Sequence, residues 1–169
     1  ALDYLENLRF TPEELDWLTE ELGRFREAIG EAPWRLAGND LPRRFPNLPA
    51  PADRYFDTAP RSRVLAHCYW QPSPTEAPTI LALHGLNGSS RSHYMQGIAA
   101  KAYARGMNVV LLNQRNCGNT EHLSAGLFHS GLTEDARHVI DELTRVDGLR
   151  AIAVSGYSLG GNLAVKLAA

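Results

Sequence analysis

The hydrophobic and polar positions predict alternating strands and helices from about residue 79 onward. Three short runs are apolar almost throughout, at residues 79–83, 107–112 and 151–154. Elsewhere apolar residues recur every three or four positions, which is the spacing of an amphipathic helix. Helices are expected over residues 92–105 and over residues 159–169. A third helix is expected to begin after Thr133, which would be its N-cap. Because continuously apolar strands are buried on both faces, the pattern predicts a mostly parallel sheet with helices on either side.

The first part of the chain has a different pattern. Two strands are expected at residues 54–58 and 63–70, before the alternation begins. Upstream, residues 11–14 read Thr-Pro-Glu-Glu, a capping-box helix start that an amphipathic pattern follows. Prolines then interrupt the chain as far as Pro51 and exclude a regular helix there. We expect an N-terminal helical and Pro-rich extension over residues 1–51 and one main domain over residues 52–169.

Composition narrows the class of protein. The chain is 44% hydrophobic and 21% charged, with a formal net charge of −2, which is typical of a globular domain. That charge provides no basic surface for nucleic acid or an anionic membrane. No apolar run approaches the ~20 residues of a membrane span, so no integral membrane segment is expected. The two cysteines, Cys68 and Cys117, lack metal-ligand spacing and favour a reduced, cytoplasmic protein, although a disulfide between them remains the alternative.

The sharpest chemical signal is Gly156-Tyr157-Ser158-Leu159-Gly160, between an apolar strand and a helix. A serine on such a strand-to-helix turn is exposed as a nucleophile, and the flanking glycines leave room for the turn. The alternative is a Gly-rich turn that binds a phosphate or nothing. Neither a P-loop lysine nor a G-x-G-x-x-G pattern is present to support that alternative.

A second signal, His84-Gly85-Leu86, follows the first of the parallel strands. An oxyanion hole needs two N–H donors, one after the nucleophile and one from this loop. We therefore expect the N–H groups of Leu159 and Leu86 to be those donors. His84 is expected to support the loop by hydrogen bonding rather than to act as the catalytic base, and Gly85 to let the backbone turn.

Taken together, four motifs resemble the AB hydrolase 4 family, the YheT-like α/β-hydrolases related to abhydrolase-domain lipases. They are His84-Gly85-Leu86-x-Gly88, Asn113-x-Arg115-x-Cys117-Gly118, His129-Ser130-Gly131-x-Thr133-Glu134-Asp135 and Gly156-Tyr157-Ser158-Leu159-Gly160-Gly161-Asn162. The chain departs from the family pattern at Asn116, where a glycine is usual. The resemblance implies an α/β-hydrolase fold, truncated after the nucleophile-elbow helix. It also implies that an Asp and a His beyond Ala169 complete a catalytic triad.

The function implied by this resemblance is hydrolysis of carboxylic esters through an acyl-enzyme on Ser158, without metal or cofactor. The expected substrate is a small-molecule or lipid ester. The sequence indicates neither the chain length of this ester nor the oligomeric state of the protein. A thioesterase or an acyltransferase on the same site stays open, as does a non-catalytic binding module. The 169-residue chain alone is expected to be inactive, because a serine without a base is a weak nucleophile.

The remaining polar residues are assigned supporting roles. We expect Asp135 and Arg115 to anchor the loop between residues 113 and 131. His122 and His129 lie on that loop and are expected to line the pocket at most. The other histidines carry no motif and are expected at the surface or in packing: His67, His93 and His138.

Overall fold

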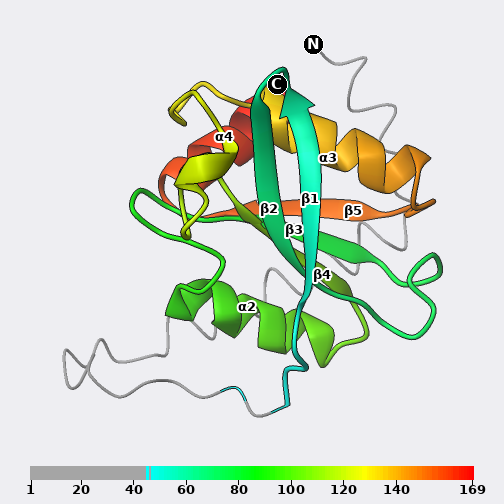
Figure 1. Cartoon of the computed structure of the whole chain (residues 1–169). Coiled ribbons are helices and arrows are strands. Elements are labelled where there is room, and N and C mark those ends of the chain that lie inside the picture. The colour runs from blue at the N-terminus through cyan, green and yellow to red at the C-terminus, as the bar shows by residue number, and fades with distance from the viewer. Residues whose placement is uncertain (1–44, 46) are drawn as a thin grey trace, which may run out of the picture. The chain divides into compact units, whose positions relative to one another are not determined.

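The computed structural model describes residue 45 and residues 47–169. The chain divides into two units, residues 1–43 and 44–169, and only the second is described below. The helix expected after residue 11 lies outside the described residues. The described elements are, in order, β1 (Ala52–Ala59), β2 (Ser62–Tyr69), β3 (Thr79–Leu83), α2 (His93–Tyr103), β4 (Asn108–Asn113), η2 (Glu121–Leu123), α3 (Glu134–Arg145), β5 (Ile152–Gly156) and α4 (Leu159–Ala168) (Figure 1).

The five strands of the described residues form one mixed sheet in the order β1-β2-β4-β3-β5. β1 and β2 form an antiparallel hairpin, and β2 also runs antiparallel to β4, whereas β3 is parallel to both β4 and β5. Leu83, the last residue of β3, pairs with Leu112 on one side and Gly156 on the other. The carboxyl ends of the parallel strands therefore lie at one edge of the sheet, as the sequence predicts for an α/β fold.

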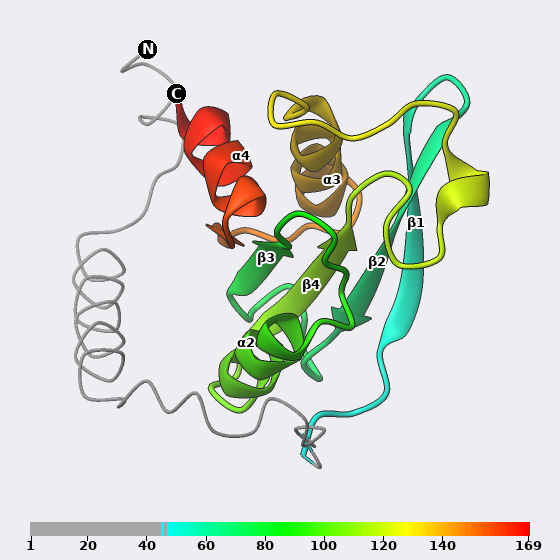
Figure 2. The same ribbon diagram turned by 90° about the vertical axis from the view of Figure 1, so that its left-hand side faces the viewer.

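Helices cover both faces of this sheet, which confirms the predicted layering. α3 and α4 lie on one face and α2 on the other (Figure 2). The side chains of a strand alternate between faces, so Leu81 and Leu83 pack in the cluster with α3 and α4, while Ala82 packs in the cluster with α2. The same alternation divides β4, whose six residues are all buried.

Two local predictions need correction. β5 was expected to be buried on both faces, yet only Ile152 is buried and residues 153–156 are half-buried. The reason is that β5 is an edge strand among the described residues, with β3 as its sheet neighbour. Thr133 does stand at the N-cap position of α3, but its backbone is helical and its side chain makes no capping hydrogen bond.

No helix in residues 47–169 is long and apolar enough to cross a membrane. Cys68 and Cys117 are free, buried thiols. Burial raises the pKa of Cys68 to about 12, so this thiol stays protonated and unreactive at neutral pH.

Candidate active site

Ser158 lies between β5 and α4 in a backbone conformation that few non-glycine residues adopt. Its φ is 52° and its ψ is −115°, and it immediately precedes the first residue of α4. Such a conformation costs of order 1–3 kcal/mol and persists only where the surrounding structure imposes it. The sequence predicted a strained strand-to-helix turn at this residue, and the structure has one.

Two glycines make the turn possible because any side chain there meets backbone. A Cβ on Gly156 would lie 2.1 Å from the carbonyl oxygen of Gly160. A Cβ on Gly160 would lie 2.3 Å from the carbonyl oxygen of Leu83. Backbone atoms cannot move aside as the end of a flexible side chain can. The turn is therefore packed directly against the end of β3.

The loop after β3 lies beside the serine. A Cβ built on Gly85 would lie 3.3 Å from the Cβ of Ser158, and the N–H of Tyr157 donates to the Leu83 carbonyl at 3.0 Å. Leu86 is 65% exposed, so this residue of the loop faces solvent. The structure thus brings together the two segments that the sequence analysis selected.

His84 is fully buried beneath this loop and both of its ring nitrogens are engaged. The backbone N–H of Gln114 donates to Nε2 at 3.1 Å, so Nε2 is the unprotonated nitrogen. Nδ1 therefore carries the proton and donates it to the Gly85 carbonyl at 2.7 Å. Burial lowers the pKa of His84, which keeps the ring neutral. A histidine held in this way has no free nitrogen with which to accept a proton from Ser158.

These contacts also orient the peptide group that contains the Leu86 N–H. The Gly85 carbonyl accepts hydrogen bonds from His84 Nδ1 and, at 3.0 Å, from the N–H of Gly88. The carbonyl and N–H of a trans peptide point in opposite directions. Holding the Gly85 carbonyl toward His84 therefore turns the Leu86 N–H away from the protein interior. Within residues 47–169 this N–H has no hydrogen-bond partner, and neither does that of Leu159 at the start of α4.

The far end of the same loop is fixed at Ser90 by a contact that the sequence did not reveal. His67, expected at the surface or in packing, is buried and lies 2.8 Å from Ser90 Oγ through Nδ1. The Ser90 N–H also donates to Asn113 Oδ1 at 2.8 Å. Because His67 belongs to β2, 23 residues before Ser90, no local pattern indicates this pairing.

Arg115 and Asp135 form a nearly buried, bidentate ion pair. Both N···O distances are 2.6 Å, and the hydrogen bonds that Arg115 donates to Asp135 raise the pKa of Arg115. The pair connects the start of the 113–133 loop, which runs from the last residue of β4 to the N-cap of α3, to the first turn of α3. Asp135 is therefore occupied by Arg115, in line with the expected anchoring role.

The other histidines take different positions. His129 is exposed and accepts the N–H of Gly131 through Nδ1. His122 lies on η2 and lines a cavity against the β1–β2 hairpin, a cavity that Ser158 does not line. His93 contacts the Tyr94 ring, and His138 lies 3.5 Å from Glu142 on α3. Among residues 47–169, no cluster of three His, Cys, Asp or Glu side chains has the arrangement of a metal site.

A five-stranded mixed sheet with helices on both faces, and a serine on a strained turn at its carboxyl edge, defines the class of α/β-hydrolases. The family model described as "alpha/beta hydrolase fold" matches residues 78–169, and the chain belongs to this family.

Relatives and solved structures are consistent with this assignment. The chain is 37% identical over 103 residues to a protein named putative esterase YheT of Escherichia coli, covering 59% of this chain and 30% of that protein. It is 28% identical over 87 residues to a monoacylglycerol lipase of Saccharomyces cerevisiae, covering 51% of this chain and 19% of that one. The chain thus spans less than a third of the length of these relatives.

Solved structures match more of the chain. An esterase of Pyrococcus furiosus has a TM-score of 0.59 at 21% identity, covering 69% of this chain and 45% of that one. An α/β serine hydrolase without a lid, from Xanthomonas campestris, has the same score and identity over 70% of this chain and 56% of that one. At this level of identity the likeness shows the fold alone.

Proposed function

We propose that the whole protein is a serine hydrolase that cleaves carboxylic esters through an acyl-enzyme on Ser158. The observation that carries the proposal is the backbone of Ser158, at a φ of 52° beside the loop of Gly85. A strained serine at the carboxyl edge of the sheet has no structural advantage over glycine, so the hydroxyl is the reason for its presence. The names of the relatives, an esterase and a monoacylglycerol lipase, support an ester substrate.

In the proposed reaction, Ser158 Oγ attacks the ester carbonyl while a general base removes the hydroxyl proton. The N–H groups of Leu86 and Leu159 donate to the oxyanion of the tetrahedral intermediate. Collapse of this intermediate releases the alcohol, which takes up the proton, and leaves the acyl group on Ser158. Water then attacks the acyl-enzyme in the same way and releases the carboxylic acid.

The base is proposed to be a histidine after residue 169, oriented by a carboxylate, as the family resemblance implies. Hydrogen bonds of two buried histidines within residues 47–169 support this proposal. Both nitrogens of His84 are engaged, and His67 contacts Ser90. The substrate is proposed to be a small-molecule or lipid ester without need of a metal or cofactor.

The test compares Ser158→Ala with the matched control Ser155→Ala in the whole protein. Ser155 lies on β5 and is half-buried, so both variants remove one hydroxyl from neighbouring positions. We expect Ser158→Ala to lower kcat on a p-nitrophenyl ester by at least about 10³-fold, and Ser155→Ala to leave it nearly unchanged. Hydrolysis at the wild-type rate by Ser158→Ala would overturn the proposal. A thioester substrate tested in parallel separates the thioesterase alternative, which predicts the higher kcat/KM for the thioester.

A further inference from the structure

The cavity that His122 lines lies at the β1–β2 hairpin, at the same edge of the sheet as Ser158. Its volume is about 630 Å³, within the range of pockets that hold small organic molecules. Leu65 of β2 pairs with Asn113, the last residue of β4, so the hairpin end of β2 lies at the carboxyl edge of the parallel strands. β2 is three strand spacings from β5 in the sheet order, roughly 14 Å across the sheet. The cavity is therefore separate from the turn that holds Ser158.

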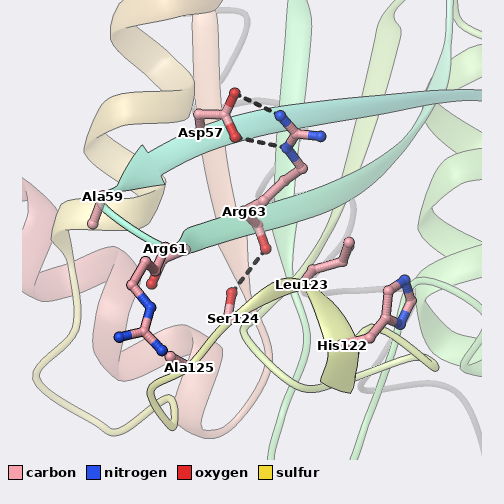
Figure 3. A pocket seen from close by; sticks show the side chains of 9 residues that line it. Asp57, Ala59, Arg61, Arg63, His122, Leu123, Ser124 and Ala125 are labelled. Carbon is pink, nitrogen blue, oxygen red and sulfur yellow. Dashed lines mark hydrogen bonds and ion pairs between the residues drawn. The ribbon is translucent and has the colours of Figure 1, made fainter.

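The charged groups of this cavity leave one cation unneutralised. Asp57 is the only carboxylate among the described lining residues, and it forms a bidentate ion pair with Arg63, at 2.6 and 2.9 Å. Arg61 has no ion-pair partner among residues 47–169. Figure 3 shows the Arg61 side chain extending beside Ala125, with His122 on the opposite side of the labelled group. Arg61 is exposed, and a guanidinium without an ion-pair partner suits a carboxylate or a phosphate, whose two oxygens match its paired N–H donors.

The backbone of Arg61 indicates that the side chain has a function. Its φ is 60°, in the left-handed region that glycine and asparagine adopt at low energetic cost and residues with long side chains rarely adopt. A cavity formed only by the fold would favour one of those residues at this turn. The two-residue turn of Pro60 and Arg61 imposes this φ, and an arginine is kept there although glycine or asparagine would be less strained.

The walls of the cavity are fixed in place without a ligand. Ser62 and Ser124 form an antiparallel bridge between the hairpin and the segment after η2. Ser124 Oγ donates to the Arg63 carbonyl at 2.9 Å, and the Ala125 N–H donates to the Arg61 carbonyl at 3.2 Å. Because these bonds tie both walls together, a ligand meets a preformed site and little ordering opposes its binding.

We propose that this cavity binds the phosphate group of a small organic anion, with Arg61 as the principal contact. The cavity is larger than an inorganic phosphate needs, so the remainder of the ligand fills the space beside Leu123 and His122. This site does not depend on the proposed ester hydrolysis, since Ser158 does not contribute to it.

The test is a titration of backbone amide chemical shifts at constant ionic strength, with glycerol 3-phosphate, inorganic phosphate and uncharged glycerol as probes. We expect saturable shifts at Arg61, Ser62, Ser124 and Ala125 with glycerol 3-phosphate, and none with glycerol. Arg61→Gln should weaken this binding at least about tenfold, whereas the exposed control Arg150→Gln should leave it unchanged. No saturable shift, or equal binding by Arg61→Gln, would overturn the site. Equal affinity for inorganic phosphate would overturn the assignment to an organic molecule.

Arg61→Gly separates binding from folding. Glycine adopts a φ of 60° without strain, so this variant should unfold at the same or a higher temperature than the wild type. We expect it to lose the saturable shifts despite that stability. Retained binding by Arg61→Gly would show that the guanidinium is not the contact.

Discussion

At the scale of single residues, the turn at Ser158 depends on atoms that cannot move. A Cβ on Gly160 would lie 2.3 Å from the Leu83 carbonyl oxygen. A Cβ on Gly97, in the middle of α2, would meet only Phe45 among the described residues, at an ordinary 3.7 Å. We predict that Gly160→Ala lowers the free energy of unfolding by about 2–3 kcal/mol or more, because the elbow must shift away from β3.

Gly97→Ala is the matched control for this prediction. It should raise the free energy of unfolding by about 0.5–1 kcal/mol, because alanine is favoured inside a helix. Urea denaturation of both variants checks the pair. A Gly160→Ala protein as stable as the wild type would contradict the packing described for the turn.

The hydrogen bonds of His84 predict different effects for two amide substitutions. The Asn amide reaches the position of Nδ1 and can still donate to the Gly85 carbonyl, whereas the Gln amide reaches the position of Nε2. We predict that His84→Gln lowers kcat of the whole protein about 10–100-fold, because the Leu86 peptide is no longer held, and that His84→Asn has a smaller effect. KM should change little in both, since the oxyanion forms only during reaction.

Steady-state kinetics on one ester, with both variants, decides this prediction. Equal losses in the two variants, or an effect on KM alone, would show that His84 supports stability without orienting the Leu86 N–H. Thermal unfolding of the same proteins provides the comparison of stability.

The lowered pKa of His84 also predicts the pH dependence of its contribution to stability. In the unfolded chain a histidine binds its proton near pH 6.5, whereas the buried ring of His84 remains neutral to lower pH. The unfolded state thus gains protons first on acidification, so stability present above about pH 6.5 is lost as the pH falls. We predict that the wild type exceeds His84→Asn in free energy of unfolding by more at pH 7.5 than at pH 5.5. A difference that grows toward pH 5.5 would contradict the neutral tautomer.

At the scale of elements, the Arg115–Asp135 pair attaches the 113–133 loop to α3. The two side chains are 13% and 8% exposed, so removing one partner leaves a nearly buried charge. We predict that Asp135→Ala costs about 3–5 kcal/mol of unfolding free energy. Asp57→Ala removes a carboxylate of the same bidentate geometry from an exposed pair, where water screens the charges, and should cost far less than Asp135→Ala. Equal costs in chemical denaturation would contradict the role of burial.

The helices and strands were largely predictable from the sequence, because their periods and end signals are local. The apolar run at residues 79–83 coincides with β3, and Gly106 follows shortly after the end of α2. The features that the sequence did not predict depend on contacts between segments that are distant along the chain. The short η2 and the cavity at Arg61 lie where the hairpin meets the 113–133 loop, and the His67–Ser90 contact joins β2 to the loop after β3. The missing side-chain cap at Thr133 is a local detail that residue preference alone did not anticipate.

At the scale of the whole molecule, residues 47–169 provide the sheet, the turn at Ser158 and the loop after β3 that lies beside it. Leu83 connects these parts, since its carbonyl accepts the Tyr157 N–H and lies against Gly160. The proposed base and its carboxylate belong to no described element. The chain thus accounts for the placement of the serine, while reactivity is proposed to depend on the remainder of the protein.

The most direct measurement is covalent labelling of the whole protein with a fluorophosphonate, followed by intact mass and peptide analysis. The account predicts a single adduct, located on Ser158, that is absent from Ser158→Ala and retained in Ser155→Ala. An adduct that persists in Ser158→Ala, or a folded wild-type protein that forms none, would contradict the assignment of Ser158 as the nucleophile.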